Sequence, residues 1–308
     1  MTSVTPKISV VICAWNAAGC IEGILKSLQK QTLKDFEIVV ANDGSTDTTA
    51  DIARKYGARV MDMEHQGLSA ARNVGINNSR AEVVAIIDAD CYATPTWLEE
   101  IHKEIEKGEV VVTGETKIPK STFLGDCISG LGYPGGGHLG FAKMWPVDSE
   151  GYTSHLAGGN CAFNKEAIQK LGAFNKKLTI TADDVYLSMK ILGNNLKIKF
   201  NPNMIMYHQP RKDLTSFIKW HYARGKGSYF FKQQIKDLGH NFGQFYTLRL
   251  WSTKNMIKKY WKSPNLPLML FLLALSFVTQ KIGYAAQKRE SRSMLEEIDG
   301  TRGGNTHL

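Results

Sequence analysis

Short apolar runs alternate with amphipathic stretches over the first ninety residues of the chain. The runs are rich in β-branched residues and predict strands over 8–12, 36–40, 59–63 and 83–87. Between them, apolar residues recur at helical spacing and predict helices over 21–28, 48–56 and 69–78. Strands that alternate with helices form βαβ units, so we expect an α/β fold with a mostly parallel sheet. Ligands of such sheets lie beyond the carboxyl ends of the strands.

Two carboxylates follow the last of these strands. Asp88-Ala89-Asp90 comes directly after the run 83–87, where a buried strand leaves the core. At such a break both side chains can turn toward one hard metal ion, for which carboxylate oxygens are suitable ligands. Acidic pairs are also common as solvated loop charges, so the pattern alone is a weak signal. It predicts a site for Mg²⁺ or Mn²⁺, which oxygen ligands suit alike.

The positive charge is confined to one part of the chain. Residues 1–210 carry 21 Lys and Arg against 23 Asp and Glu, whereas residues 211–292 carry 16 against 3. This local excess predicts a surface that binds anions. The candidate ligands are nucleic acid, lipid phosphate and a phosphorylated substrate. Five cysteines without a C-x-x-C pair argue against a zinc ribbon or a disulfide framework. Residues 1–7 hold no apolar signal region, so we expect a reducing, cytosolic setting.

The last hundred residues are predicted to be helical. Residues 214–261 interleave aromatic and basic side chains, which favours a membrane interface over nucleic acid as the partner. The apolar run 266–278 covers only about 20 Å as a helix, short of a hydrocarbon core of about 30 Å, but 266–286 would reach across. The helix therefore lies in the membrane plane, spans the membrane, or packs on protein. The polar tail after Glu290 is expected to be loose.

Residues 128–140 hold six glycines and Pro134, which predicts a mobile loop. It is either a passive connection or a lid over a substrate. No Gly-Lys-Ser/Thr follows, so it is not a Walker phosphate loop.

Two further segments offer polar side chains at strand or helix ends. The turn 42–47 follows the second strand, and its Asp43 carboxylate can accept a hydrogen bond from a nucleobase. The segment 67–75 opens a helix that carries Arg72 among small residues. Arg72 either faces solvent or contacts a nucleotide.

Together, in this order and spacing, these motifs resemble the inverting family-2 glycosyltransferases with the GT-A fold. The resemblance covers about residues 7–230. Further matching segments are 158–163, 182–184, 208–211 and 220–225. The usual Pro before the aromatic residue and Asn of the first strand is absent in Cys13-Ala14-Trp15-Asn16.

The resemblance implies a role for particular residues. Asp184 would be the catalytic base. The metal ligands would be Asp88, Asp90 and His208, and the donor would be bound by Trp15, Asp43, Arg72, Asp88 and Asp183. Asp183 stands where the family usually has Glu.

The expected organisation is a GT-A catalytic domain over 1–210, with a nucleotide-sugar half to about 115 and an acceptor half from 116. A basic aromatic region over 211–262 and an apolar helix with a polar tail over 263–308 form a membrane-associating extension. The expected reaction is inverting, metal-dependent transfer from a nucleotide-diphosphate sugar, with UDP favoured, to a hydroxyl or phosphate of a polyprenyl-linked or polysaccharide acceptor. The expected place is the cytoplasmic face of the membrane.

Two other functions stay open. One is a sugar-1-phosphate nucleotidyltransferase, against which the absence of Arg or Lys between Cys13 and Cys20 argues. The other is a non-catalytic glycan- or partner-binding module, against which the intact carboxylates Asp90 and Asp184 argue.

Overall fold

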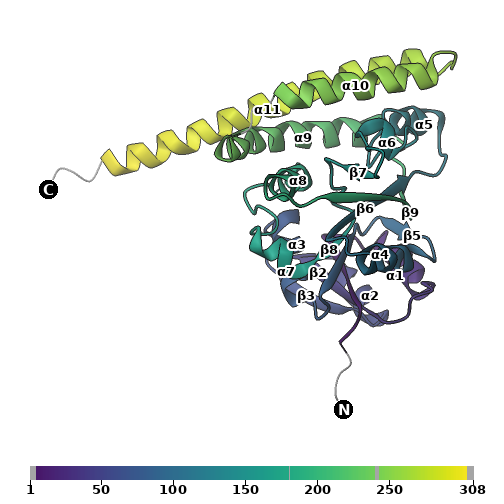
Figure 1. Ribbon diagram of the computed structural model, residues 1–308. Coiled ribbons are helices and arrows are strands. Elements are labelled where there is room, and N and C mark those ends of the chain that lie inside the picture. Colours follow the sequence, from purple (N-terminus) through teal and green to yellow (C-terminus); the bar gives the residue numbers. More distant parts are fainter. Residues whose placement is uncertain (1–4, 180, 240–242, 304–308) are drawn as a thin grey trace.

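The computed structural model describes residues 5–179, 181–239 and 243–303. Within them a nine-stranded sheet has the strand order β3-β2-β1-β4-β8-β6-β9-β5, and β7 pairs with β9. The strands are β1 (Ile8–Ala14), β2 (Phe36–Asp43), β3 (Arg59–Met63), β4 (Val83–Ile87), β5 (Cys91–Ala93), β6 (Val111–Lys117), β7 (Tyr152–Thr153), β8 (Asn160–Asn164) and β9 (Ile198–His208). Figure 1 shows the sheet at the centre of the molecule.

The first four strands are parallel, as the alternating pattern predicts. Helices α1 (Ile21–Gln29), α2 (Thr49–Lys55) and α3 (Leu68–Asn78) connect them. Strand β1 lies between β2 and β4, with Ile8 opposite Phe36 on one side and Val83 on the other. The carboxyl ends of β1, β2 and β4 therefore lie along one edge of the sheet.

The second part of the sheet is mixed. Strand β8 runs antiparallel to both β4 and β6, while β6 and β9 are parallel. The remaining helices of this part are α4 (Trp97–Glu106), α5 (Phe123–Gly130), α6 (Phe141–Met144), α7 (Lys165–Lys170) and α8 (Asp183–Gly193). Antiparallel β8 brings Asn160 opposite Ile87, so the segment before β8 lies beside the turn after β4.

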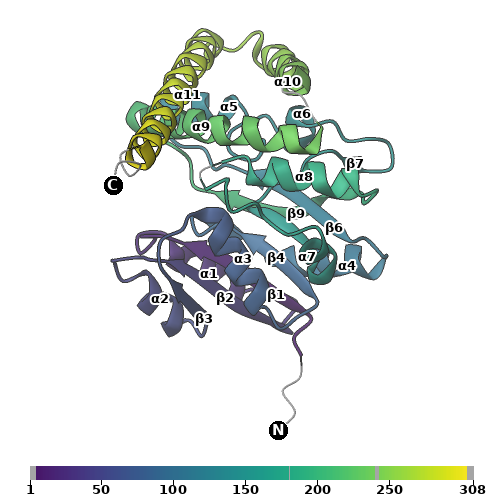
Figure 2. The same cartoon turned by 90° about the vertical axis from the view of Figure 1, so that its left-hand side faces the viewer.

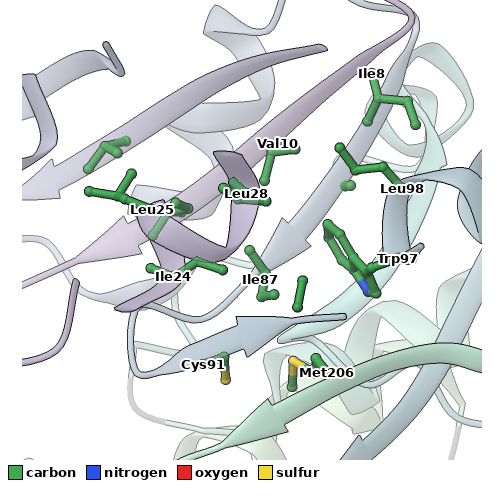
Figure 3. Close-up of a cluster of buried hydrophobic side chains, with 14 of the residues drawn as sticks. Ile8, Val10, Ile24, Leu25, Leu28, Ile87, Cys91, Trp97, Leu98 and Met206 are labelled. Carbon is green, nitrogen blue, oxygen red and sulfur yellow. The ribbon is translucent and has the colours of Figure 1, made fainter. Parts of the chain in front are cut away.

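Each face of the sheet carries its own apolar core. In β1, Val10 and Ile12 point into a cluster with α1 and α4, whereas Val11 points into a cluster with α3, α7 and α8. This alternation follows from the period of two in a strand, and burial on both faces explains the continuous apolar run of β1. Figure 3 shows the first cluster, to which α4 contributes Trp97 and Leu98 and β4 contributes Ile87.

Three long helices form a layer on the far side of α8. They are α9 (Leu214–Gln234), α10 (Gly243–Tyr260) and α11 (Leu266–Gly303), with a short 3-10 turn over Ile235–Leu238. Figures 1 and 2 show α9 between α8 and the pair α10 and α11. A third apolar cluster joins this layer to α5 and α6 and contains Phe217, Met256 and Met269.

Helices α9 and α11 touch along their backbones. A Cβ atom at Gly225 would overlap the carbonyl oxygen of Gln280, and one at Gly283 would overlap that of Tyr222. Only glycine permits this approach, so the two helices are fixed lengthwise against each other.

Two expectations about this region were wrong. The chain after Glu290 continues as helix α11 to Gly303, because helix-forming residues such as Glu296 and Glu297 follow and no proline interrupts them. The glycine-rich segment is not an open loop. Its first three residues end α5, and Gly135 and Gly137 lie so close to Thr116 and Ser129 that added Cβ atoms would clash.

Candidate active site

The acidic turn lies beside the end of another strand. Asp88 and Asp90 lie between β4 and β5, and Cys91 of β5 pairs in register with His208, the last residue of β9. Ligand atoms of these four residues all lie within 4.8 Å of one another, and His208 Nε2 is 3.3 Å from Asp90 Oδ2. The predicted metal ligands are therefore brought together by β4 and β9.

The hydrogen bonding of His208 suits a metal ligand. Its Nδ1 lies 2.8 Å from the carbonyl oxygen of Gln209, to which it can only donate. Nε2 is left facing Asp90, so this nitrogen and the carboxylate can bind one cation between them. The residues thus fit a divalent ion held by Asp88, Asp90 and His208. Burial raises the pKa of Cys91, so its thiol stays protonated and is a poor ligand for a hard cation.

Asp88 is shaped by its neighbours. Burial raises the pKa of Asp88 and outweighs the charge of the Arg72 guanidinium, which lies 3.4 Å away and lowers it. The charge of Asp90 raises the pKa further. A Cβ atom at Gly159 would overlap Asp88 Oδ2, so the glycine leaves the space that this carboxylate occupies.

Asp184 contacts the same short segment. Its Oδ2 accepts a hydrogen bond of 3.4 Å from the Gly158 backbone N–H, and its Oδ1 accepts one of 2.8 Å from Val185. Both carboxylates therefore contact Gly158-Gly159, which brings side chains 96 positions apart in the sequence to one place. The first turn of α8 favours the negative charge of Asp184. Ala182, just before it, has a positive φ of 64°, a strained conformation of the kind that occurs at functional sites.

Arg72 and Asp183 form a buried ion pair. Arg72 Nη1 lies 2.5 Å from Asp183 Oδ2, and both residues are 3% exposed. Ser69 lies 3.4 Å from the same carboxylate, and the Arg72 guanidinium lies over the Phe174 ring. Burial raises the pKa of Asp183, and the charge of Arg72 offsets only part of that rise. Arg72 thus faces the protein interior rather than bulk solvent.

Asp43 and Trp15 lie at the neighbouring strand ends. The two carboxylate oxygens of Asp43 accept hydrogen bonds of 2.8 and 2.9 Å from the backbone N–H groups of Gln66 and Gly67. Asp43 therefore holds the segment before α3. Trp15 is 56% exposed and stacks on His65 at 4.4 Å, which gives a flat aromatic surface at the edge of β1 and β2.

A cavity of about 640 Å³ connects the carboxylates to the helical layer. Arg72, Asp88, Asp183, Asp184 and His208 line one end. The other end is lined by residues of α9, α10 and α11, among them Arg224, Arg249, Phe277, Lys281 and Tyr284. Trp15, Asp43 and Asp90 are outside this lining, so the predicted site residues divide between the cavity and the adjoining sheet edge.

The fold is that of the GT-A glycosyltransferases. The mannosyltransferase PcManGT from Pyrobaculum calidifontis, solved with GDP-Man and Mn²⁺, has a similar structure, with a TM-score of 0.56 and 20% sequence identity. The similarity covers 95% of this chain and 81% of that chain. TarS of S. aureus, solved with UDP-GlcNAc, gives a TM-score of 0.54 at 16% identity, with 92% of each chain covered.

Residues 9–172 match the family model Glycosyl transferase family 2, and the chain belongs to this family. AglE of Haloferax volcanii, a glycosyltransferase, is 27% identical over 74% of each chain. EpsH of Bacillus subtilis is 38% identical over 32% of this chain and 30% of its own length. The match to EpsH therefore spans less than a third of that relative.

Some residues of the site escaped the sequence analysis. His65 has no motif around it and becomes notable only through its contacts with Trp15 and Asp43. Arg249 lies in a helix rich in basic residues, and only the fold separates it from the exposed lysines of the same helix.

Proposed function

We propose that the protein transfers a sugar, with inversion at the anomeric carbon, from a nucleotide-diphosphate sugar to a hydroxyl of a membrane-associated acceptor. The observation that carries this proposal is the contact of both Asp184 and Asp88 with the single segment Gly158-Gly159. A base for the acceptor and a cation site for the departing diphosphate then adjoin one cavity. The proposed division is a nucleotide-sugar half to about residue 115 and an acceptor half from 116 to 210.

Asp184 is the proposed general base. It lines the cavity, and its two hydrogen bonds come from backbone N–H groups, which fix the carboxylate while leaving lone pairs free. In a direct displacement it takes the proton of the attacking hydroxyl as the oxygen bonds to the anomeric carbon and the nucleotide diphosphate leaves. General base catalysis of this kind contributes about 10²- to 10⁴-fold in rate.

Asp88, Asp90 and His208 are the proposed ligands of Mg²⁺ or Mn²⁺. When bound, the ion supplies Lewis-acid neutralisation of the leaving diphosphate. The solved complex of PcManGT with GDP-Man and Mn²⁺ supports this assignment. GalNAc-T7, solved with UDP, GalNAc and Mn²⁺, supports it further at a TM-score of 0.55.

Trp15 and Asp43 are proposed to hold the nucleoside. The exposed Trp15 ring offers a stacking surface, and Asp43 organises the loop that carries His65 beneath it. Arg72 is proposed to act on the donor through the position that it gives to Asp88, which it contacts at 3.4 Å. UDP is the favoured nucleotide, and the complex of TarS with UDP-GlcNAc supports it.

Membrane association is proposed to involve α11. Of the described residues, Leu266–Ser293 is a segment long and apolar enough to cross a membrane, and 28% of its most apolar part is buried. Large apolar side chains are exposed along it outside the cavity, namely Leu270, Phe271, Val278 and Ile282. Because α11 is fixed lengthwise on α9, we propose that it lies in the plane of the cytoplasmic membrane surface rather than across the bilayer.

The test of the function is a panel of nucleotide sugars with Mn²⁺ and a polyprenyl-phosphate-linked or free saccharide acceptor. We expect one donor to be consumed with release of nucleoside diphosphate, and Asp184→Asn to lower the rate about 10²-fold or more while donor binding persists. Release of inorganic pyrophosphate from a nucleoside triphosphate and a sugar phosphate would instead identify a nucleotidyltransferase. Donor binding with no metal-dependent turnover would identify a binding module.

A further inference from the structure

Three arginines gather where the catalytic domain meets the helical layer. Arg211 follows β9, Arg224 lies on α9 and Arg249 lies on α10. The residue between them is His221 of α9, which is fully buried. Charges of all three arginines act on His221, and together with burial they lower its pKa to about 3. His221 is therefore neutral, and the positive charge of the cluster is carried by the guanidinium groups.

Aromatic rings hold the guanidinium groups in place. Those of Arg211 and Arg224 each lie 4.8 Å from the Trp220 ring, and that of Arg224 also lies over Tyr133. Arg249 lies 4.0 Å from the Phe277 ring and donates a hydrogen bond of 3.1 Å to the Ser276 hydroxyl. Stacking of this kind orients the planar donors without neutralising their charge.

The charges of Asp90 and Asp184 act on Arg211 and Arg224, but no carboxylate among the described residues lies in ion-pair contact with the cluster. The Nε groups of Arg211 and Arg249 and the Nε2 atom of His221 are buried without a hydrogen-bond partner among the described residues. Buried cations and unpaired buried donors are costly, which points to a ligand that supplies negative oxygens. Arginine forks match phosphate oxygens in geometry as well as in charge.

Two arginines of the cluster line the cavity that also contains the site carboxylates. Arg224 and Arg249 line the cavity on the side of helices α9 and α10, and Arg224 lies near enough to Asp184 for that charge to act on it. Helix α11 adds the aromatic rings of Phe277 and Tyr284 to the wall, together with the polar side chains of Gln280 and Lys281. A ligand there would have its anionic group at the arginines and its apolar part along the helix with the exposed apolar face.

We propose that Arg211, Arg224 and Arg249 form an anion subsite for the phosphate of a lipid-phosphate acceptor. The inference rests on the proposed function and names the acceptor class for it. The subsite adjoins the metal ligands that are proposed for the donor diphosphate, because the charge of Asp90 acts on Arg211, but the members that line the cavity, Arg224 and Arg249, come from the helical layer. It positions the lipid phosphate between α9 and α10, with the hydrocarbon chain toward α11, and places a hydroxyl of the saccharide linked to that phosphate beside Asp184.

Equilibrium binding of farnesyl phosphate tests the subsite without any turnover. The comparison uses the full chain, farnesol and inorganic phosphate as probes, and the variants Arg249→Gln and Arg211→Gln. Lys254→Gln is the matched control, because it removes one charge from an exposed position of the same helix. We expect each arginine variant to weaken farnesyl phosphate binding by about tenfold or more, as loss of charge-assisted hydrogen bonds does. Lys254→Gln should bind as the unaltered protein does.

UDP binding with Mn²⁺, measured on the same samples, separates the sources of phosphate. Affinity for UDP within about twofold of the unaltered protein would support the subsite and show that each variant is folded. An equal loss of UDP and farnesyl phosphate affinity would assign the arginines to the donor diphosphate and overturn the proposal. Inorganic phosphate that binds as tightly as farnesyl phosphate would overturn the lipid part of it.

If Arg249→Gln does not fold, Arg211→Gln decides, because Arg211 makes no side-chain hydrogen bond among the described residues. Failure of donor turnover would count against the proposed function and leave these binding results standing.

Discussion

Arg72 Nη1 lies 2.5 Å from Asp183 Oδ2, and this buried ion pair ties α3 to the first turn of α8. The pair is next in sequence to Asp184 and next in space to Asp88, which Arg72 contacts on its other side. Asp183 therefore positions the proposed base and the proposed metal carboxylate at the same time. Its role is distinct from that of Asp184, although the two residues are adjacent and chemically alike.

The different roles of the two aspartates predict different stability effects. Asp183→Asn leaves Arg72 with a weaker partner in the interior, and removal of one member of a buried pair costs about 3 to 5 kcal/mol. Asp184→Asn removes a carboxylate at a helix N-terminus, a loss of about 0.3 to 1 kcal/mol. Urea denaturation of both variants checks the order. Equal stabilities of the two variants would contradict the structural role of Asp183.

Gly159→Ala tests the packing of the site. The added methyl group would occupy the space of Asp88 Oδ2, so we expect the carboxylate to move and Mn²⁺ affinity and sugar transfer to fall. Gly23→Ala in α1 is the matched control, since nothing lies within 4 Å of its added Cβ atom. That control should gain about 0.5 to 1 kcal/mol of stability and keep full activity. Activity of Gly159→Ala equal to that of Gly23→Ala would show that the position of Asp88 is unimportant.

His208 and Asp90 predict a metal titration. We expect His208→Gln to raise the Mn²⁺ concentration that half-activates donor turnover by about 10- to 100-fold, a range typical of weakened metal sites. Asp90→Asn should have a larger effect, because it removes a charged ligand. The control is His102→Gln, on α4, which pairs with Glu106 far from the metal ligands. An unchanged Mn²⁺ dependence in His208→Gln would remove this residue from the metal site.

The outer face of α11 predicts membrane binding. Leu270, Phe271, Val278 and Ile282 are between 42% and 58% exposed, so their replacement by serine should leave the core intact and release the protein from anionic vesicles. Deletion of the helix is a poorer test, since Met269 and Leu272 on its inner face belong to the third apolar cluster. Co-sedimentation with vesicles measures the effect. Full retention of the fourfold serine variant would contradict the proposed membrane contact.

Buried histidines predict that the protein loses stability in acid. Burial, together with the charge of Arg224, lowers the pKa of His155 to about 3, against 6.5 for an exposed ring. When folding lowers the pKa of a histidine, the histidine stabilises the fold at pH values above its pKa in the unfolded state. That stabilisation is lost as the pH falls toward its pKa in the folded state. The free energy of unfolding should therefore fall between pH 6.5 and pH 3, by at most about 1.4 kcal/mol per pH unit for each such histidine. Denaturation of His155→Gln should show a shallower slope over pH 7 to 5. An identical slope would show that His155 does not titrate on unfolding.

Local sequence pattern was sufficient for the first half of the fold. Strands β1 to β4 and helices α1 to α3 lie within one to three residues of their predicted bounds, because strand and helix periods differ clearly there. The acidic turn after β4 was also predictable, since its position depends only on the end of one apolar run. The antiparallel insertion of β8 was not, because strand order is decided by long-range pairing that no local pattern encodes.

The contacts of the site residues were harder to predict than their positions. The sequence suggested either solvent or a nucleotide for Arg72, whereas the folded chain pairs it with Asp183, 111 residues away. Asp43 was expected at a nucleobase, and its oxygens also hold two backbone N–H groups of the following loop. Both outcomes depend on the need to satisfy buried polar groups, which becomes apparent only when the neighbours are known.

The most direct test is the location of Mn²⁺ and of the donor sugar in crystals of Asp184→Asn, in which turnover is slowed. We expect an anomalous peak for Mn²⁺ among Asp88, Asp90 and His208, and an anomeric carbon separated from residue 184 by the width of one acceptor hydroxyl. A metal bound elsewhere, or a sugar whose anomeric carbon faces away from residue 184, would contradict the shared site on which the account depends.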